Sequence, residues 1–243
     1  MTNLLDSGWK LPPVMVGTSA GAAIATSLLT CSAREALASC KRLYDQNDQL
    51  FDWLSLTRLK LKFAHQYIYP AWIESFTSDH HFDRLRSASS ELIVAITRPA
   101  RYLGLAGSLV AGSIAYMVDK KIAHSIHPQL PRYLGLRQEF LNLKSETNGQ
   151  AARVLLQAVA AASPFMLAQR VNGEWGFDGG YADNAPIPPQ TEEQKTKTLV
   201  LLTRHYPDLP AIFQWNGRTY WQPRALKFIG SFITTMLVCR LQI

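Results

Sequence analysis

The sequence has few of the residues that build disulfide-rich or zinc-stabilised folds. It contains three cysteines, an odd number, and no two of them have the spacing of a zinc site. It also lacks an Asn-X-Ser/Thr glycosylation site, and no basic stretch followed by a long apolar run opens it. We therefore expect neither a disulfide framework nor a signal peptide. We expect the protein to reside in a reducing, cytoplasmic compartment.

Internal repeats, low-complexity tracts and clear linkers are also lacking, so we expect one domain over residues 1–243. The chain is 47% hydrophobic and 18% charged, which is typical of a globular protein with a substantial core. Its formal charge is +7, with basic residues scattered along the chain. That charge fits an anionic membrane surface, nucleic acid or a solvated basic face. No recognition motif accompanies it, so we expect no nucleic-acid partner.

Local patterns predict an α/β fold. Short apolar runs predict strands at 14–16, 91–97 and 198–203, and small or periodic apolar residues predict helices at 19–29, 32–45 and 149–162. Ser32 and Glu35 form a capping-box pattern at the start of the second helix. Asn172-Gly173 lies between two strand-like runs and predicts a tight hairpin, and Asn216-Gly217 gives a second hairpin-like pattern.

Two apolar segments leave a choice open. Residues 102–118 are uncharged for seventeen residues, the lower limit for a membrane-spanning helix. Gly104, Ser108 and Gly112 recur every four residues there and suit close helix packing. The segment is therefore either a buried helix or one that contacts or enters a membrane. The apolar tail, residues 221–243, predicts a packed terminal helix or a helix at a membrane interface.

The motif Gly17-Thr18-Ser19-Ala20-Gly21 has the form of a nucleophile elbow. An apolar run precedes it and a helix rich in small residues follows it. A serine at a sharp strand-to-helix turn needs small neighbours, because the strand and the helix crowd the turn. The helix also directs its N-terminal N–H groups toward the serine, which favours negative charge there.

A serine hydroxyl needs a base before it can act as a nucleophile, and two assignments remain open. The order Ser19, Asp178, His205 matches the triad order of α/β-hydrolases, although those enzymes place several strands before the elbow. The alternative is a Ser–Asp dyad. Asp178 is followed by Gly179 and Gly180, which let the chain turn tightly and bring the carboxylate to a neighbouring element.

The pair of motifs "VGTSAGA" and "FDGGYADNAPI" resembles the patatin-like phospholipase family, and "AAASPFM" resembles a further stretch of that family with compressed spacing. The resemblance extends from about residue 5 to about residue 203. It implies a three-layer α/β fold with a mostly parallel central sheet and helices on both faces. Between about 100 and 145 we expect an apolar helical insert.

By this resemblance Ser19 is the nucleophile and Asp178 the general base of an acyl-lipid hydrolase. The expected substrate is a phospholipid or another acyl lipid, a membrane surface is an expected partner, and neither a metal nor a cofactor is required. Asn184 and Pro186 match a downstream motif that shapes the loop. The neighbours expected to line the substrate site are Gly17, Thr18, Ala20, Gly21, Gly179 and Gly180.

The sequence departs from the family at its start. Family members begin with a strand and a glycine-rich loop whose N–H groups form the oxyanion hole, whereas here Gly8 is a single turn glycine. Three explanations stand open: an N-terminally truncated chain, a catalytically weak lipid-binding relative, or donors from another segment such as the N–H of Ala20. Without the missing strand we expect an exposed edge beside the elbow strand.

The histidines give weak signals by themselves. Adjacent His80 and His81 point apart on a helix, and no third metal ligand is evident. His127 carries no motif, and we interpret it as an ordinary surface or packing residue.

Overall fold

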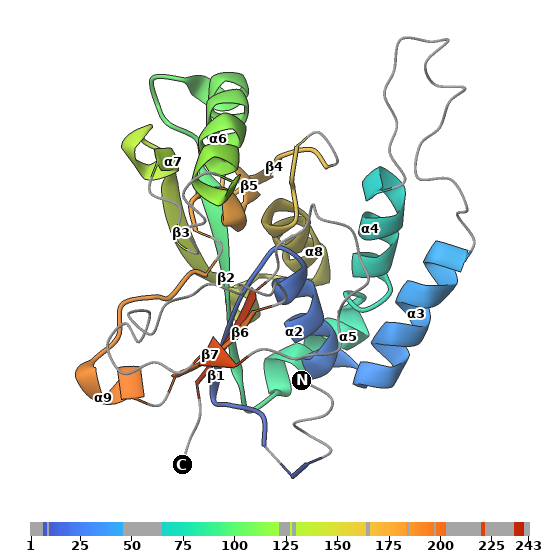
Figure 1. Cartoon of the computed structure of the whole chain (residues 1–243). Coiled ribbons are helices and arrows are strands. Elements are labelled where there is room, and N and C mark those ends of the chain that lie inside the picture. The colour runs from blue at the N-terminus through green and yellow to red at the C-terminus, as the bar shows by residue number, and fades with distance from the viewer. Residues whose placement is uncertain are drawn as a thin grey trace.

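The computed structural model describes residues 7–8, 10–45, 65–121, 127, 130–163, 166–183, 185–196, 198–202, 220–221 and 236–240. Helices and strands alternate along much of this part of the chain, as Figure 1 shows. The helices are α2 (Ala20–Thr30), α3 (Ala33–Asp45), α4 (His65–Glu74), α5 (Asp79–Ser87), α6 (Gly104–Lys121), α7 (Leu130–Tyr133), α8 (Gly149–Val159) and α9 (Glu192–Thr196), with 3-10 turns η2 (Leu143–Ser145) and η3 (Gly179–Tyr181). The strands are β1 (Val14–Thr18), β2 (Glu91–Arg98), β3 (Arg137–Asn142), β4 (Gln169–Val171), β5 (Glu174–Asp178), β6 (Thr198–Leu202), β7 (Tyr220–Trp221) and β8 (Met236–Arg240).

The predicted α/β class is confirmed, but the sheet is mixed where we expected a mostly parallel one. The strand order is β4-β5-β2-β1-β8-β6-β7, and β3 also pairs with β2. The β1–β2 and β6–β7 pairs are parallel, whereas β2 pairs antiparallel with both β3 and β5. Antiparallel pairing also joins β4 to β5, because the Asn172-Gly173 turn is too short for the crossover that a parallel pair requires.

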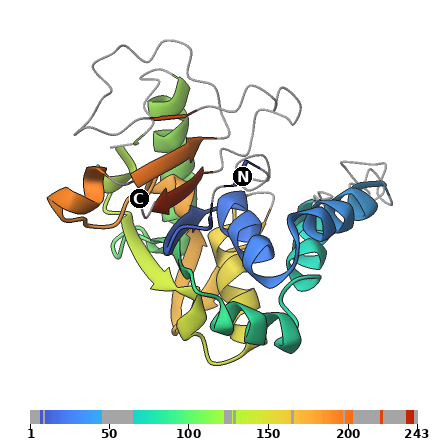
Figure 2. The ribbon, with the colours of Figure 1, turned by 90° about the horizontal axis from the view of Figure 1, so that it is seen from below.

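Helices lie on both sides of this sheet. Figure 1 shows α2, α4, α5 and α8 on one side and α7 and α9 on the other, and Figure 2 shows α2 and α8 beside the strands. The core lies beneath α2 and α8, where Leu155 and Leu156 of α8 pack with Leu92 and Ile96 of β2. Small residues of α2 let this helix lie close to β1, as the sequence predicts: Ala22 and Ala25 are fully buried.

Two local predictions are confirmed at atomic detail. The Ser32 Oγ accepts a hydrogen bond from the Glu35 N–H at 3.2 Å, and the Glu35 carboxylate accepts one from the Ser32 N–H at 2.8 Å. This is the reciprocal pattern of a capping box at the start of α3. In the β4–β5 hairpin, Asn172 and Gly173 have φ values of 54° and 80°, as a type I′ turn requires.

The prediction of a helical tail is wrong for residues 236–240, which form strand β8. This strand pairs antiparallel with β1, from Val14 opposite Arg240 to Thr18 opposite Met236. Its other edge pairs with β6. An apolar run of this length does not distinguish a strand from a helix by itself, so long-range pairing decides. The expected exposed edge beside β1 is therefore also wrong, because β8 covers it.

The segment expected as a helical insert is helical only in its first part. It contains α6 and α7, but residues 137–142 form β3, which pairs with β2. In the part of the chain that the structure describes, no helix is both long and apolar enough to cross a membrane.

Candidate active site

Ser19 occupies a sharp turn between β1 and α2. Its φ and ψ are 50° and −134°, and α2 begins at the next residue. A residue with a side chain in this region costs about 1–3 kcal/mol and persists only where its surroundings enforce it. The packing at Gly17 contributes to this constraint, because a Cβ at this position would lie 2.7 Å from the Ala22 backbone. Strand and helix therefore cross too closely for any residue but glycine.

The serine and the aspartate that the motifs paired lie in direct contact. Ser19 Oγ donates a hydrogen bond to Asp178 Oδ2 at 2.8 Å, although 159 positions separate them in the sequence. Both side chains are nearly enclosed, with Ser19 4% and Asp178 6% exposed. In such surroundings a charge-assisted hydrogen bond is stronger than it would be in water.

Several interactions hold Asp178 in place. It ends β5 opposite Ile96 of β2, and its N–H donates to the Ala161 carbonyl at 3.3 Å. Carboxylate oxygen Oδ1 accepts the Gly180 N–H at 2.8 Å, which leaves Oδ2 directed at the serine. Ala161 belongs to the "AAASPFM" stretch, so this third motif contributes a backbone contact to the site.

Gly179 is required by space. A Cβ at this position would lie 2.1 Å from the Ala95 carbonyl oxygen and 2.3 Å from Thr18 Oγ1. The loop thus passes directly over the ends of β1 and β2. This close approach brings the Asp178 carboxylate to the elbow serine.

Two threonines near the ends of β1 and β2 make hydrogen bonds where the loop passes over these strands. Thr97 Oγ1 donates to the Asp178 carbonyl at 2.8 Å and accepts the Ala182 N–H at 3.2 Å. Thr18 Oγ1 donates to the Ala95 carbonyl at 3.3 Å. Both threonines are fully buried, so these bonds satisfy groups that water cannot reach.

Tyr181 connects residues 178–183, which we call the aspartate loop, to α6. Its hydroxyl donates to the Ser163 carbonyl at 3.2 Å and lies 3.2 Å from Ser113 Oγ of α6. Burial raises the pKa of the Tyr181 hydroxyl above its usual value, and the negative charge of Asp178 adds to that rise. The hydroxyl therefore stays protonated and remains a hydrogen-bond donor.

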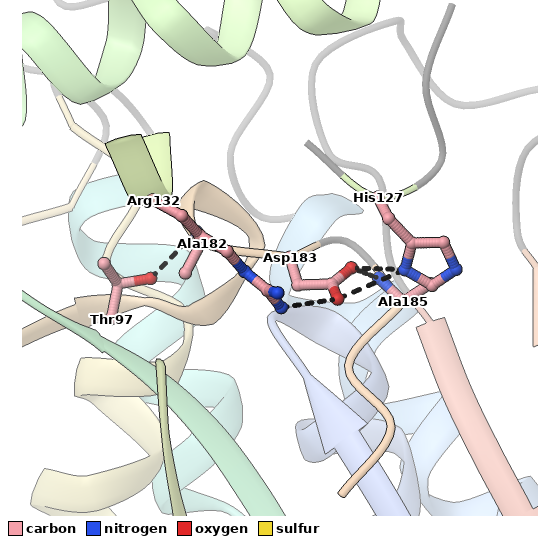
Figure 3. Close-up of polar contacts among 6 residues, drawn as sticks. All are labelled: Thr97, His127, Arg132, Ala182, Asp183 and Ala185. Carbon is pink, nitrogen blue, oxygen red and sulfur yellow. Dashed lines mark hydrogen bonds and ion pairs between the residues drawn. The ribbon is translucent and has the colours of Figure 1, made fainter. Parts of the chain in front are cut away.

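A second charged group lies at the end of the same loop (Figure 3). Asp183 is 5% exposed, and His127 Nδ1 lies 2.9 and 3.1 Å from its two carboxylate oxygens. Arg132 of α7 donates to Asp183 Oδ2 at 3.3 Å, and the Ala185 N–H donates to Oδ1 at 2.8 Å. Through these contacts, His127, together with Arg132 of α7, holds the loop that carries Asp178.

The structure places the predicted site residues at one spot and adds others. Gly17 and Thr18 end β1, Ala20 and Gly21 begin α2, and Gly179 and Gly180 belong to η3.

Two further residues named from the sequence, Asn184 and His205, lie outside the described residues. The structure therefore does not test the triad alternative, which requires His205. Sequence reasoning missed four residues around this loop, namely Thr97, His127, Tyr181 and Asp183. Tyr181 and Asp183 stand inside the quoted aspartate motif, but a lone threonine or histidine gives no signal.

Comparison with known proteins agrees with this geometry. A family model described as patatin-like phospholipase matches residues 7–189 of the 243-residue chain. The match covers well over half of the chain and includes both Ser19 and Asp178. Searches among curated proteins and among solved structures gave no match.

Proposed function

Because the chain belongs to the patatin-like phospholipase family, we propose that it is a serine acyl-lipid hydrolase that works through a Ser19–Asp178 dyad. The observation that carries this proposal is the 2.8 Å hydrogen bond from the strained serine to the buried carboxylate. A general base must lie within hydrogen-bond distance of the proton that it removes, and Asp178 does.

The chemistry needs no further reactant than the ester and water. Ser19 Oγ attacks the ester carbonyl carbon while its proton passes to Asp178, which forms a tetrahedral oxyanion. The carbon–oxygen bond to the alcohol then breaks, and Asp178 gives the proton to the leaving alkoxide. Water next transfers a proton to Asp178 and attacks the acyl-enzyme. The fatty acid departs, and the proton returns to Ser19.

The surroundings of the dyad support this sequence of steps. The Gly180 N–H fixes the carboxylate, so Oδ2 faces the serine before the substrate binds. A base that is already oriented does not need to reorganise during the reaction.

In this proposal, the N-terminus of α2 stabilises the negative charge of the tetrahedral oxyanion. This eleven-residue helix begins at Ala20, and the first N–H groups of a helix have no partner within it. We assign the Ala20 N–H as one donor to the oxyanion, and the helix dipole acts in the same direction.

A catalytically weak lipid-binding relative is the second candidate. It is favoured because the described residues offer the Ala20 N–H but no glycine-rich loop beside the elbow. Losing one oxyanion donor typically lowers turnover by about 10²–10³. The two candidates therefore differ in rate and not in the location of the site.

Turnover of a short-chain nitrophenyl ester separates these candidates. We expect Ser19→Ala to lower kcat by about four orders of magnitude or more. A wild-type chain no faster than Ser19→Ala would reject the hydrolase proposal in favour of the weak relative. His205→Ala tests the triad: the dyad predicts nearly full activity, and a loss of orders of magnitude would reject the dyad.

A further inference from the structure

Helix α6 has an unusual distribution of side chains. Its most deeply buried positions carry small or polar residues: Ser108 is fully buried and Ala115 is 5% exposed. Leu105 and Leu109 are partly buried and pack against the core. Its outward positions carry large apolar residues, with Val110 64%, Ile114 61% and Met117 52% exposed. A helix that only packs on a soluble domain carries polar or charged residues on its outward side.

The small residues on the inner side are explained by close packing. A Cβ at Gly112 would lie 2.8 Å from a Leu136 methyl carbon and 3.3 Å from the Tyr181 ring. Ser108 Oγ accepts the Ala100 N–H at 2.9 Å. The inner side of α6 therefore packs on the rest of the domain. These packing contacts do not explain why large apolar residues lie on the exposed side of the helix.

The exposed residues form one continuous stripe, which we call the outer face of α6. Ala106, Val110 and Ile114 follow one another at intervals of four in α6, and Met117 continues the stripe one turn later. Tyr102 lies in the turn just before the helix. Tyr102 is 71% exposed, and Tyr133 on the neighbouring α7 is 81% exposed. Figure 1 shows α6 projecting beyond the sheet with α7 beside it. Exposed tyrosines bordering an apolar surface are typical of a membrane interface.

The charge around this face has one sign. Residues 101–137 contain five Lys and Arg residues and one acidic residue, Asp119, which gives +4 of the chain's +7. Asp119 is only 6% exposed and accepts the Leu130 N–H at 2.8 Å, so it does not offset the basic residues at the surface. Arg101 and Arg137 are exposed, and Arg132 is exposed while it also pairs with Asp183. Such a border complements an anionic surface.

We propose that the outer face of α6, together with Tyr133, docks on an anionic lipid surface. The choice of a lipid partner rests on the proposed lipid hydrolase function. The helix lies in the plane of the interface and inserts one side, as amphipathic interfacial helices do. Its opposite side contacts Tyr181, three residues after Asp178, so docking brings the lipid surface close to the aspartate loop.

Vesicle co-sedimentation of the full chain carrying Ser19→Ala tests this inference without hydrolysis. The test variant adds Val110→Glu and Ile114→Glu. The matched control adds Leu37→Glu and Leu167→Glu, which place the same charges at leucines 63% and 76% exposed that do not belong to α6. The probes are vesicles of phosphatidylcholine with phosphatidylglycerol and vesicles of phosphatidylcholine alone.

We expect binding to the anionic vesicles to fall at least about tenfold in the test variant, because charged groups resist insertion. The matched control retains parental binding apart from the shared charge effect. Arg101→Gln should weaken binding about fivefold, the effect of one basic residue near an anionic surface. High salt should weaken it further.

Equal binding by the test and control variants would overturn the proposal, as would no binding by the parent chain at low salt. Self-association that the outer-face substitutions abolish would assign the face to a second copy of the chain and also overturn it. Hydrolysis of a soluble nitrophenyl ester by the chain with native Ser19 keeps the two proposals distinguishable. Turnover without vesicle binding defeats the docking alone, and binding without turnover defeats the hydrolase.

Discussion

The aspartate loop and the outer face of α6 break the ordinary rule of burial in opposite ways. Around Asp178, hydroxyl and carboxylate groups are almost fully enclosed and bonded to one another. On α6, large apolar side chains are more than half exposed. Polar groups inside and apolar groups outside both cost stability relative to the usual arrangement. Such departures concentrate at functional sites, which assigns chemistry to the first region and partner binding to the second.

After the loss of Ser19 itself, replacing the base should give the largest effect, and it should act on activity alone. Asp178→Asn keeps the size of the side chain and removes its ability to take the Ser19 proton. We expect kcat to fall by about 10²–10⁴ while the fold persists. Steady-state kinetics with a nitrophenyl ester checks this, with circular dichroism as the control for folding. Turnover within a few-fold of wild type would show that Asp178 is not the base.

Filling the space at Gly179 should strongly destabilise the loop. In Gly179→Ala the new methyl group meets the Ala95 carbonyl oxygen, a backbone atom that cannot rotate away. We expect a loss of about 3–5 kcal/mol of unfolding free energy, from steric overlap in a packed region. Gly173→Ala is the matched control, because nothing lies within 4 Å of its Cβ and only its φ of 80° resists the change. The control should lose about 1 kcal/mol in urea titrations; equal losses would contradict the crowding argument.

Removing the Thr97 hydroxyl should have an intermediate effect. Thr97→Val keeps the shape but leaves the Ala182 N–H without this acceptor and the Asp178 carbonyl without this donor. Because both partners are buried, we expect a loss of about 1–3 kcal/mol. Thr97→Ser should recover most of it. Thermal or urea unfolding that shows no difference between the Val and Ser variants would mean that the hydroxyl does not hold the loop.

Substitution on the outer face of α6 should have the smallest effect on stability. Ile114 is 61% exposed, so Ile114→Gln removes few packed contacts and should change the unfolding free energy by about 0.5 kcal/mol or less. Ala115→Gln, one position along and 5% exposed, should cost several times more because it faces inward. If both variants lose equal stability in urea, the inner and outer sides of α6 are not distinct.

The sequence was most informative where chemistry depends on short motifs. The resemblance of the two glycine-bordered motifs to one family predicted that Ser19 and Asp178 act together. Their glycines agreed with this, because glycine permits the close approach of neighbouring segments. The capping box and the Asn172-Gly173 turn were likewise predictable, since both depend on neighbours in the sequence. Local patterns also identified the strands that hold the elbow.

Long-range pairing was not predictable in the same way. Nothing in residues 236–240 alone selects a strand, and their position between β1 and β6 depends on partners more than thirty positions away. His127 and Asp183 meet across 56 positions with no motif to announce the contact. The orientation of α6 was hidden because an apolar helix of small and large residues has no clear polar side, so only packing shows which residues face outward.

Labelling with a fluorophosphonate probe tests the central claim most directly, because such probes form a covalent bond with an activated serine hydroxyl. Peptide mapping by mass spectrometry after reaction of the intact chain identifies the modified residue. The Ser19–Asp178 dyad predicts a single adduct on Ser19, absent in Ser19→Ala and formed at least about a hundredfold more slowly in Asp178→Asn. No adduct on the folded chain, or an adduct at full rate in Asp178→Asn, would contradict it.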